Sequence, residues 1–369
     1  MAKVVGIVNL HSDVELKGLT ARRPVASVNF LGRYGVIDFV LSNLSNSNVD
    51  NVGVLIKEKP RSLFKHLGTG NSWNFNSKTG GVSLLYNEVH ANNPVYNHDI
   101  NNLVENVSFL KTANPDYVVV APAHIITTMD YNDVLEAHVK SGAEITMVYQ
   151  QIDNAHEAFV GTDYLTLKGK DEVVEIKTNK GNRKERNISL ETYVFNTKVL
   201  LELMEYAKNV SSSYSLKDTL AYICDERKVA AYEYRGYARC INSFDAYVKT
   251  SLELLDMDVN TQVFKSNWPI FTNTNDTPPT KYLKNAKVSK SFVANGAVID
   301  GTVEGTIVGR EVVVGEGAVV KNCILMNNAV VAPGAYLENV VVDKEARVEK
   351  RKELVGKEET LYIKEGDVI

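Results

Sequence analysis

The sequence of 369 residues has no long apolar run, no excess of basic residues and no paired-cysteine motif. Without an apolar run of about 20 residues, a membrane-spanning helix is not expected. The formal charge of -4 makes nucleic acid and anionic membranes poor partners. The three cysteines (Cys224, Cys240 and Cys323) lack CxxC spacing, which argues against structural zinc and favours a reducing compartment. Because no signal peptide is evident, the sequence predicts a cytoplasmic protein.

Glycine is missing where the opening segment would most need it. Residues 4–24 read "VVGIVNLHSDVELKGLTARRP". The segment starts as a buried strand and ends in a basic turn, which is the layout of a loop that holds phosphates. Between these parts, residues 9–15 supply bulky and acidic side chains and no glycine. The segment therefore has the strand and the basic turn that flank a phosphate-binding loop, but it lacks the glycines of such a loop.

The N-terminal two thirds of the chain have the alternating pattern of apolar and amphipathic segments that is typical of an α/β domain. From residue 1 to about 245, apolar runs such as "KVVGIVNL", "NVGVLI" and "DYVVVAPAH" alternate with amphipathic stretches such as "NDVLEAHVKSG". Strands that are apolar on consecutive positions indicate a mainly parallel sheet covered on both faces. Ligands of such sheets bind beyond the carboxyl ends of the strands. We therefore look for a site in the loops after "VVGIV" and "DYVVVA".

Residues 286–369 have a different, six-residue period, and residues 246–285 are interpreted as a linker. The recurring aliphatic residues are Val308, Val314 and Val320 and, after one shortened step, Leu325, Val331 and Leu337. This pattern predicts a left-handed parallel β-helix, with an ordinary antiparallel sheet as the alternative. Many hexapeptide β-helices belong to acyltransferases that use a histidine base. The last histidine here is His156, so we expect the β-helix to be structural or oligomer-forming.

Several motifs, in order along the chain, carry a resemblance to one family. They include "GRYGVIDFVLSNLSNS", "DYNDVLEAHVKSGAEITMVYQ" and "NWPIFTNTNDTPPTKYL", followed by the hexad repeat. The sequence resembles ADP-glucose pyrophosphorylase, also called glucose-1-phosphate adenylyltransferase. The resemblance implies a Rossmann-like nucleotidyltransferase domain followed by a left-handed parallel β-helix. It also implies the synthesis of ADP-glucose and pyrophosphate from ATP and glucose 1-phosphate for glycogen or starch.

The nucleotide loop departs from the pattern of this family. Active members carry G-G-x-G-x-R-L, and its three glycine positions fall here on Leu10, His11 and Asp13. Its arginine position falls on Glu15. Side chains at glycine positions block close approach of the backbone to phosphates. The two carboxylates are expected to repel a triphosphate.

The residues at the metal and sugar positions also differ from the motifs of this family. The two aspartates that the resemblance assigns to Mg²⁺ are replaced by Ala123 and Cys240, which lack the oxygen ligands that Mg²⁺ requires. The neighbouring His124 is interpreted as a packed or hydrogen-bonded residue. A glycine of the family's sugar site is replaced by Glu191, and only Asp99 remains of another sugar-site motif.

Three arginines are candidates for an effector site. In the family, basic residues in this region contribute to binding phosphorylated sugars or other anions, and Arg22, Arg23 and Arg33 match that region. Arginine suits such anions because its guanidinium group forms bidentate hydrogen bonds. The alternative is that these arginines only keep the surface solvated.

Together, the departures make the chain most similar to the non-catalytic, D-type glycogen biosynthesis subunit of bacteria. That resemblance implies a heterotetramer with a catalytic paralogue and no cofactor in this chain. Mg²⁺ is expected in the catalytic partner, and a phosphorylated sugar is the expected effector. The alternatives are an active glucose-1-phosphate adenylyltransferase and a stand-alone sensor of sugar phosphates.

Overall fold

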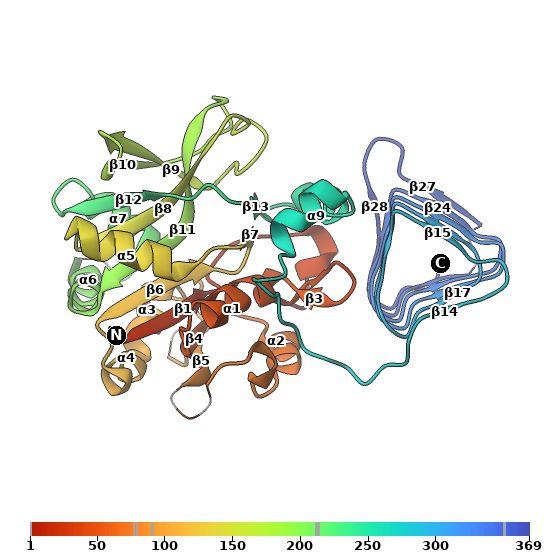
Figure 1. The fold of residues 1–369 in the computed structure, drawn as a ribbon, viewed down its shortest axis with the longest axis horizontal. Coiled ribbons are helices and arrows are strands. Elements are labelled where there is room, and N and C mark those ends of the chain that lie inside the picture. The colour runs from red at the N-terminus through yellow and green to blue at the C-terminus, as the bar shows by residue number, and fades with distance from the viewer. Residues whose placement is uncertain (1, 77, 79, 90–91, 211–214, 350–351) are drawn as a thin grey trace. The chain divides into compact units, whose positions relative to one another are not determined.

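The computed structural model describes residues 2–76, 78, 80–89, 92–210, 215–349 and 352–369, and it divides into two compact units (Figure 1). The first unit holds the residues up to Asp13 together with residues 37–240 and 266–271. The second unit holds residues 14–36, 241–265 and 272–369. No helix among the described residues is long and apolar enough to cross a membrane.

A nine-stranded sheet forms the centre of the first unit in the described part of the chain. In spatial order its strands are β5 (Gly81–Tyr86), β4 (Asn51–Ile56), β1 (Val4–Asn9), β6 (Tyr117–Pro122), β11 (Arg186–Asn196), β8 (Ile145–Ile152), β12 (Val229–Glu233), β10 (Glu172–Thr178) and β9 (Asp163–Lys168). A separate short ribbon pairs β7 (Ile125–Thr127) with β13 (Ala238–Cys240).

The strands β5, β4, β1 and β6 are parallel, as their consecutive apolar positions predict. The other half of the sheet is mixed. β11 runs antiparallel to both of its neighbours, β6 and β8, whereas β8 and β12 are parallel. β9 and β10 form an antiparallel pair. The sheet is thus less uniformly parallel than the sequence predicts. β11 is buried on consecutive positions, as the parallel strands are, so its direction cannot be told from its burial pattern.

Helices cover both faces of this sheet (Figure 1). They are α1 (Ile37–Asn46), α2 (Pro60–Leu67), α3 (Asp99–Glu105), α4 (Val107–Ala113), α5 (Tyr131–Ser141), α6 (Thr197–Val210) and α7 (Leu216–Ile223). One buried cluster joins α3, α4, α6 and α7 to alternate residues of the central strands, including Val5 and Ile7 of β1. On the opposite face α1 lies so close to β1 that a Cβ at Gly6 would stand 2.8 Å from Leu44.

The second unit contains the β-helix, which is left-handed and parallel as the hexads predict. Three parallel sheets of five strands each form its sides. The sheets are β14 (Lys281–Tyr282), β17 (Val298–Ile299), β20 (Val313–Val314), β23 (Val330–Val331) and β26 (Arg347–Val348); β15 (Lys287–Ser289), β18 (Thr302–Glu304), β21 (Val319–Lys321), β24 (Tyr336–Glu338) and β27 (Glu353–Val355); and β16 (Phe292–Val293), β19 (Ile307–Val308), β22 (Ile324–Leu325), β25 (Val340–Val342) and β28 (Leu361–Ile363).

The six aliphatic residues of the hexads all point into the core of the β-helix, where they are fully or almost fully buried. Parallel pairing places each one above its counterpart in the next coil, as in Val314 above Val331. The repeat therefore arises because every coil presents one aliphatic side chain per side to a continuous core.

Residues 14–36 also belong to the second unit, together with α8 (Phe244–Glu253) and α9 (Met257–Val263). The segment 14–36 includes the short 3₁₀ turns Lys17–Thr20 and Val25–Ser27 and the ribbon of β2 (Asn29–Phe30) and β3 (Tyr34–Gly35). It lies against the β-helix so closely that a Cβ at Gly32, whose φ is +76°, would stand 2.7 Å from the carbonyl oxygen of Val308.

This division differs from the predicted domains 1–245, 246–285 and 286–369. Residues 14–36 group with the β-helix, much of the predicted linker is helical in α8 and α9, and the first β-helix strand begins at Lys281. The grouping of residues 14–36 rests on contacts between residues far apart in the chain, which local periodicity does not record.

Candidate functional site

The predicted nucleotide loop and the first predicted metal position follow neighbouring strands. β1 ends at Asn9 and β6 ends at Pro122, and these two residues are paired in register. Leu10 and His11 follow β1, and Ala123 and His124 follow β6. The sheet therefore brings the residues at the start of the loop and at the first metal position to one edge, at the carboxyl ends of parallel strands.

His11 fits into this edge as a packed side chain. Asn9 Oδ1 accepts a hydrogen bond from the backbone N–H of His11 over 3.0 Å and lies 3.2 Å from His11 Nδ1. His11 Nε2 lies 3.5 Å from the side-chain nitrogen of Asn102. Burial lowers the pKa of His11 to about 4, against the opposing charge of Asp99, so the ring is neutral near pH 7.

Leu10 is buried, and its backbone N–H donates to the carbonyl oxygen of Leu55 over 3.0 Å. A phosphate-binding loop needs free backbone N–H groups directed at its ligand. Here the N–H groups of Leu10 and His11 already have protein acceptors. At the start of the loop, side chains therefore fill the space that a phosphate would need, and the backbone N–H groups are already hydrogen-bonded.

The two acidic loop residues differ in their surroundings. Asp13 is exposed and forms an ion pair with Lys57, a partner that the sequence reasoning missed. This pairing reduces the repulsion that was predicted from Asp13 alone, since a neighbouring cation offsets its charge. Glu15 is exposed and belongs, with the rest of residues 14–36, to the second unit.

The predicted metal positions carry no oxygen ligand. Ala123 and Cys240 are both buried, and Cys240 lies on β13 opposite Ile125 of β7. Burial, with a further contribution from the charge of Glu191, raises the pKa of the Cys240 thiol well above its ordinary value. A methyl group and a neutral thiol do not fit Mg²⁺. Among the described residues, no group of three or more histidine, cysteine or acidic side chains is placed to hold a metal ion.

A cluster of charged side chains lies near these positions, and we call it the Glu191 cluster. It consists of His124, Asp163, Glu191 and Lys217. Lys217 Nζ lies 3.3 Å from Asp163 and 3.7 Å from Glu191. The other carboxylate oxygen of Glu191 lies 3.6 Å from His124 Nε2. Glu191 and His124 were singled out from the sequence, whereas Lys217 and Asp163 were not, because they come from distant segments of the chain.

Asp99 has a structural position at the start of α3. Its Oδ1 accepts hydrogen bonds from the backbone N–H groups of Ile100 and Leu216, over 2.9 and 2.8 Å. Its Oδ2 accepts from the side chain of Asn9 over 2.8 Å. The buried carboxylate thereby joins the end of β1 to the first residues of α3 and α7.

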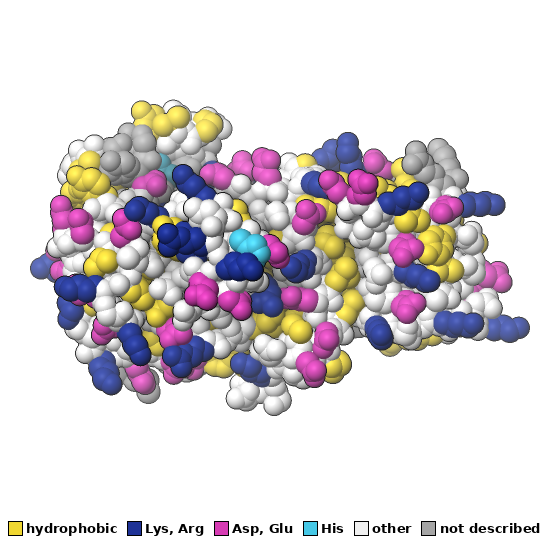
Figure 2. All heavy atoms as spheres, turned by 90° about the horizontal axis from the view of Figure 1, so that it is seen from above, with side chains coloured by type: hydrophobic (Ala, Val, Ile, Leu, Met, Phe, Trp, Pro, Cys, Tyr) yellow, Lys and Arg dark blue, Asp and Glu magenta, His cyan; other side chains and the backbone are white. Residues whose placement is uncertain are grey.

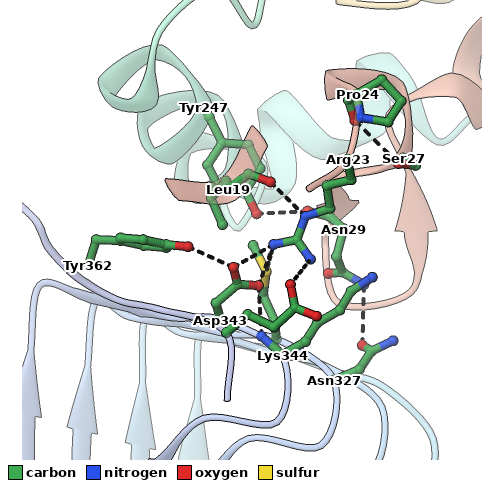
Figure 3. Close-up of polar contacts among 12 residues, drawn as sticks. Leu19, Arg23, Pro24, Ser27, Asn29, Tyr247, Asn327, Asp343, Lys344 and Tyr362 are labelled. Atoms are coloured by element: carbon green, nitrogen blue, oxygen red, sulfur yellow. Dashed lines mark hydrogen bonds and ion pairs between the residues drawn. The ribbon is translucent and has the colours of Figure 1, made fainter. Parts of the chain in front are cut away.

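The three arginines of the expected effector site have different environments, all within the second unit. Arg22 and Arg33 are exposed. Arg23 is only 3% exposed, and its guanidinium group forms an ion pair with both carboxylate oxygens of Asp343 (Figure 3). An effector anion would have to compete with Asp343 for Arg23. Of the three predicted arginines, Arg22 and Arg33 are therefore the exposed ones.

Charges of both signs share the surface. On the face shown in Figure 2, Lys and Arg side chains alternate with Asp and Glu side chains, and neither sign forms a continuous field. A groove of about 670 Å³ in the first unit is lined by residues of β8, β9, β11 and β12 and of the loops beside them, among them Tyr149, Tyr164, Arg186 and Arg235. None of the predicted site residues lines this groove.

Comparisons with known proteins agree with the two-part architecture. The family described as "Nucleotidyl transferase" matches residues 14–256, and "GlmU-like, C-terminal hexapeptide" matches residues 278–363. A glucose-1-phosphate adenylyltransferase of Fervidobacterium nodosum is 30% identical over 93% of this chain and 83% of its own length. Another, of Thermosipho africanus, is 31% identical over 82% of this chain and 74% of its own. The glycogen biosynthesis protein GlgD of Bacillus subtilis is 29% identical over 95% of this chain and 92% of its own.

Proposed function

Because the chain belongs to the glucose-1-phosphate adenylyltransferase family, we propose that it is a catalytically inactive, regulatory member that acts on a catalytic paralogue. The observation that carries the proposal is the chemistry at the two metal positions. Ala123 offers no ligand, and the buried thiol of Cys240 stays protonated near pH 7. Transfer between phosphates relies on a metal ion to offset developing negative charge. Without carboxylates at these positions, the chain lacks that support.

The nucleotide loop supports the same proposal. His11 and Leu10 occupy space at the carboxyl end of β1, and their backbone N–H groups already donate to Asn9 and Leu55. A triphosphate would have to displace these contacts before it found any free donor there. The nucleotide loop and the metal positions therefore both lack the groups that catalysis needs. This favours an inactive chain that keeps the family fold over an active enzyme with an unusual metal site.

In this proposal the chain works through assembly in the cytoplasm. It joins a catalytic subunit, which holds the Mg²⁺, in a heterotetramer that makes ADP-glucose for glycogen. The B. subtilis relative, which is named a glycogen biosynthesis protein, supports this setting. Regulation requires that the chain contact the active and inactive states of its partner differently. A phosphorylated sugar bound near Arg22 and Arg33 would bias those states.

A reconstitution experiment tests the proposal. The purified chain is titrated into a catalytic paralogue, and pyrophosphate release is measured at several glucose 1-phosphate and effector concentrations. We expect a saturable change in kcat, KM or effector response that ends at a fixed subunit ratio. Unchanged kinetics together with sugar-phosphate binding by the chain alone would favour the stand-alone sensor. Turnover by the chain alone would favour an active enzyme.

A further inference from the structure

Glu191 has a backbone conformation that is unusual for its place. It lies inside β11 with φ at +49°, at the point where the register between β11 and β8 shifts. Non-glycine residues rarely adopt a left-handed conformation, and within a strand it is unfavourable for a long side chain. The bulge turns the Glu191 side chain into the Glu191 cluster. Interactions of the carboxylate must therefore offset the backbone strain.

Those interactions come from the ammonium group of Lys217 and from the ring of His124, whose pKa is lowered by burial, so that Lys217 is the cation of the pair. Lys217, on α7, lies 3.7 Å from one carboxylate oxygen of Glu191, and His124, which follows β6, lies 3.6 Å from the other. Asp163 of β9 contacts the same ammonium group, and the charge of Glu191 also contributes to raising the pKa of the Cys240 thiol. The Glu191 carboxylate thus lies between Lys217 and His124, at ion-pair distance from the ammonium group and near the imidazole.

The Glu191 cluster is partly exposed to solvent at Lys217 and Glu191 and is buried at His124. The side chains of Lys217 and Glu191 are 35% and 20% exposed, whereas that of His124 is 4% exposed. His124 Nδ1 is buried without a hydrogen-bond partner among the described residues. A buried polar atom with no partner is uncommon and costs free energy, so Glu191 leaves the hydrogen-bonding capacity of His124 unsatisfied at this nitrogen.

We propose that Lys217 and His124 form a small oxyanion site that Glu191 keeps occupied from within the chain. The class of ligand it excludes is a carboxylate or phosphate group, which matches the Glu191 carboxylate in charge and hydrogen-bonding capacity. Removal of the Glu191 side chain leaves a solvent-accessible space beside Lys217, which a free anion of this class fills. The inference extends the proposed loss of catalysis, yet it concerns ion binding by this chain alone.

The test is chemical rescue in the full-length chain. In Glu191→Gly the side chain is removed, and glycine adopts φ near +49° without strain, so the variant is expected to fold. Acetate or inorganic phosphate, compared with chloride at equal ionic strength, should raise its Tm saturably, by about 2 °C or more at tenfold excess over Kd. The Tm of the wild-type chain should not respond to these anions beyond a general salt effect.

Three further variants make the result specific. Glu345→Gly is a matched control, because Glu345 is exposed with φ at +60° on the β-helix, and its Tm should show no anion response. Glu191→Gly combined with Lys217→Met should lose the response. Glu191→Asn, which also tolerates this conformation, should show a weaker response and serves if the glycine variant is poorly folded. Equal anion responses of wild type and Glu191→Gly, or a response that survives Lys217→Met, would overturn the inference.

The outcome is separable from the regulatory role. Rescue needs no catalytic paralogue, nucleotide or magnesium. A chain that fails to regulate a paralogue could still show anion rescue in Glu191→Gly. Conversely, a regulatory chain without rescue would refute the oxyanion site alone.

Discussion

Removing the carboxylate of Asp343 should destabilise the second unit strongly. Asp343 is fully buried and binds the guanidinium group of Arg23, and its Oδ2 accepts a hydrogen bond from the Tyr362 hydroxyl over 2.8 Å (Figure 3). Asp343→Ala would leave Arg23 with the carbonyl oxygen of Leu19 and with Glu365, which lies 3.8 Å away and is partly exposed. These contacts replace the lost charge only in part.

The size of the effect follows from leaving one charge of a buried ion pair without its partner. Breaking such a pair costs about 3–5 kcal/mol, because the remaining ion stays desolvated. Replacing both partners with apolar residues is often close to neutral. We therefore expect Asp343→Ala to lower the free energy of unfolding by about 3 kcal/mol or more, and Arg23→Met with Asp343→Leu to lower it by clearly less.

Urea unfolding followed by circular dichroism measures these free energies, and hydrogen exchange of residues 14–36 reports the segment that Arg23 holds. In Asp343→Ala, amides of this segment should exchange faster than in wild type, and those of β1 should change little. Glu359→Ala is a control that removes a charge partner of the same segment, because Glu359 and Lys17 form an exposed ion pair worth under about 1 kcal/mol. A loss below about 1 kcal/mol for Asp343→Ala would refute the reasoning.

Three more predictions concern the first unit. Ala123→Asp with Cys240→Asp should leave the chain nearly inactive in pyrophosphate release, since Leu10 and His11 still close the loop; a rate near that of a catalytic paralogue would show that the loop is no obstacle. The Cys240 thiol should resist iodoacetamide at pH 7.5 in the folded chain, because burial raises its pKa; mass spectrometry showing alkylation as fast as in urea would contradict this. Folding lowers the pKa of His11 from 6.5 to about 4. The neutral His11 ring therefore stabilises the folded chain fully above pH 6.5, and this stabilisation is lost as the pH falls towards 4. His11→Gln should accordingly reduce the pH dependence of the unfolding free energy in this window by about 2–3 kcal/mol, and equal pH profiles of the two chains would refute the assignment.

The fold could be predicted from the sequence where it depends on local periodicity. The hexads place Val314 and Val331 in one core, and the apolar run of β1 gives a strand buried on both faces. The inclusion of residues 14–36 in the second unit could not be predicted in this way. It depends on contacts such as that of Arg23 with Asp343, which are 320 positions apart in the sequence.

The candidate site shows the same limit. The resemblance pointed to Leu10, Ala123 and Cys240 because each stands where a motif expects another residue. The partners that decide their chemistry, such as Lys57 for Asp13, leave no motif in the sequence. Sequence reasoning therefore points to residues that depart from the family motifs, and the structure shows which side chains surround them.

We infer that this chain does not carry out adenylyl transfer by itself. The most direct test is a single-turnover assay in which the purified chain is in excess over labelled ATP, with Mg²⁺ and glucose 1-phosphate at saturating concentrations. A catalytic paralogue under the same conditions serves as the positive control. The account predicts no ADP-glucose above the protein-free background. Formation of ADP-glucose at a rate on the order of 1 per second or faster would contradict it.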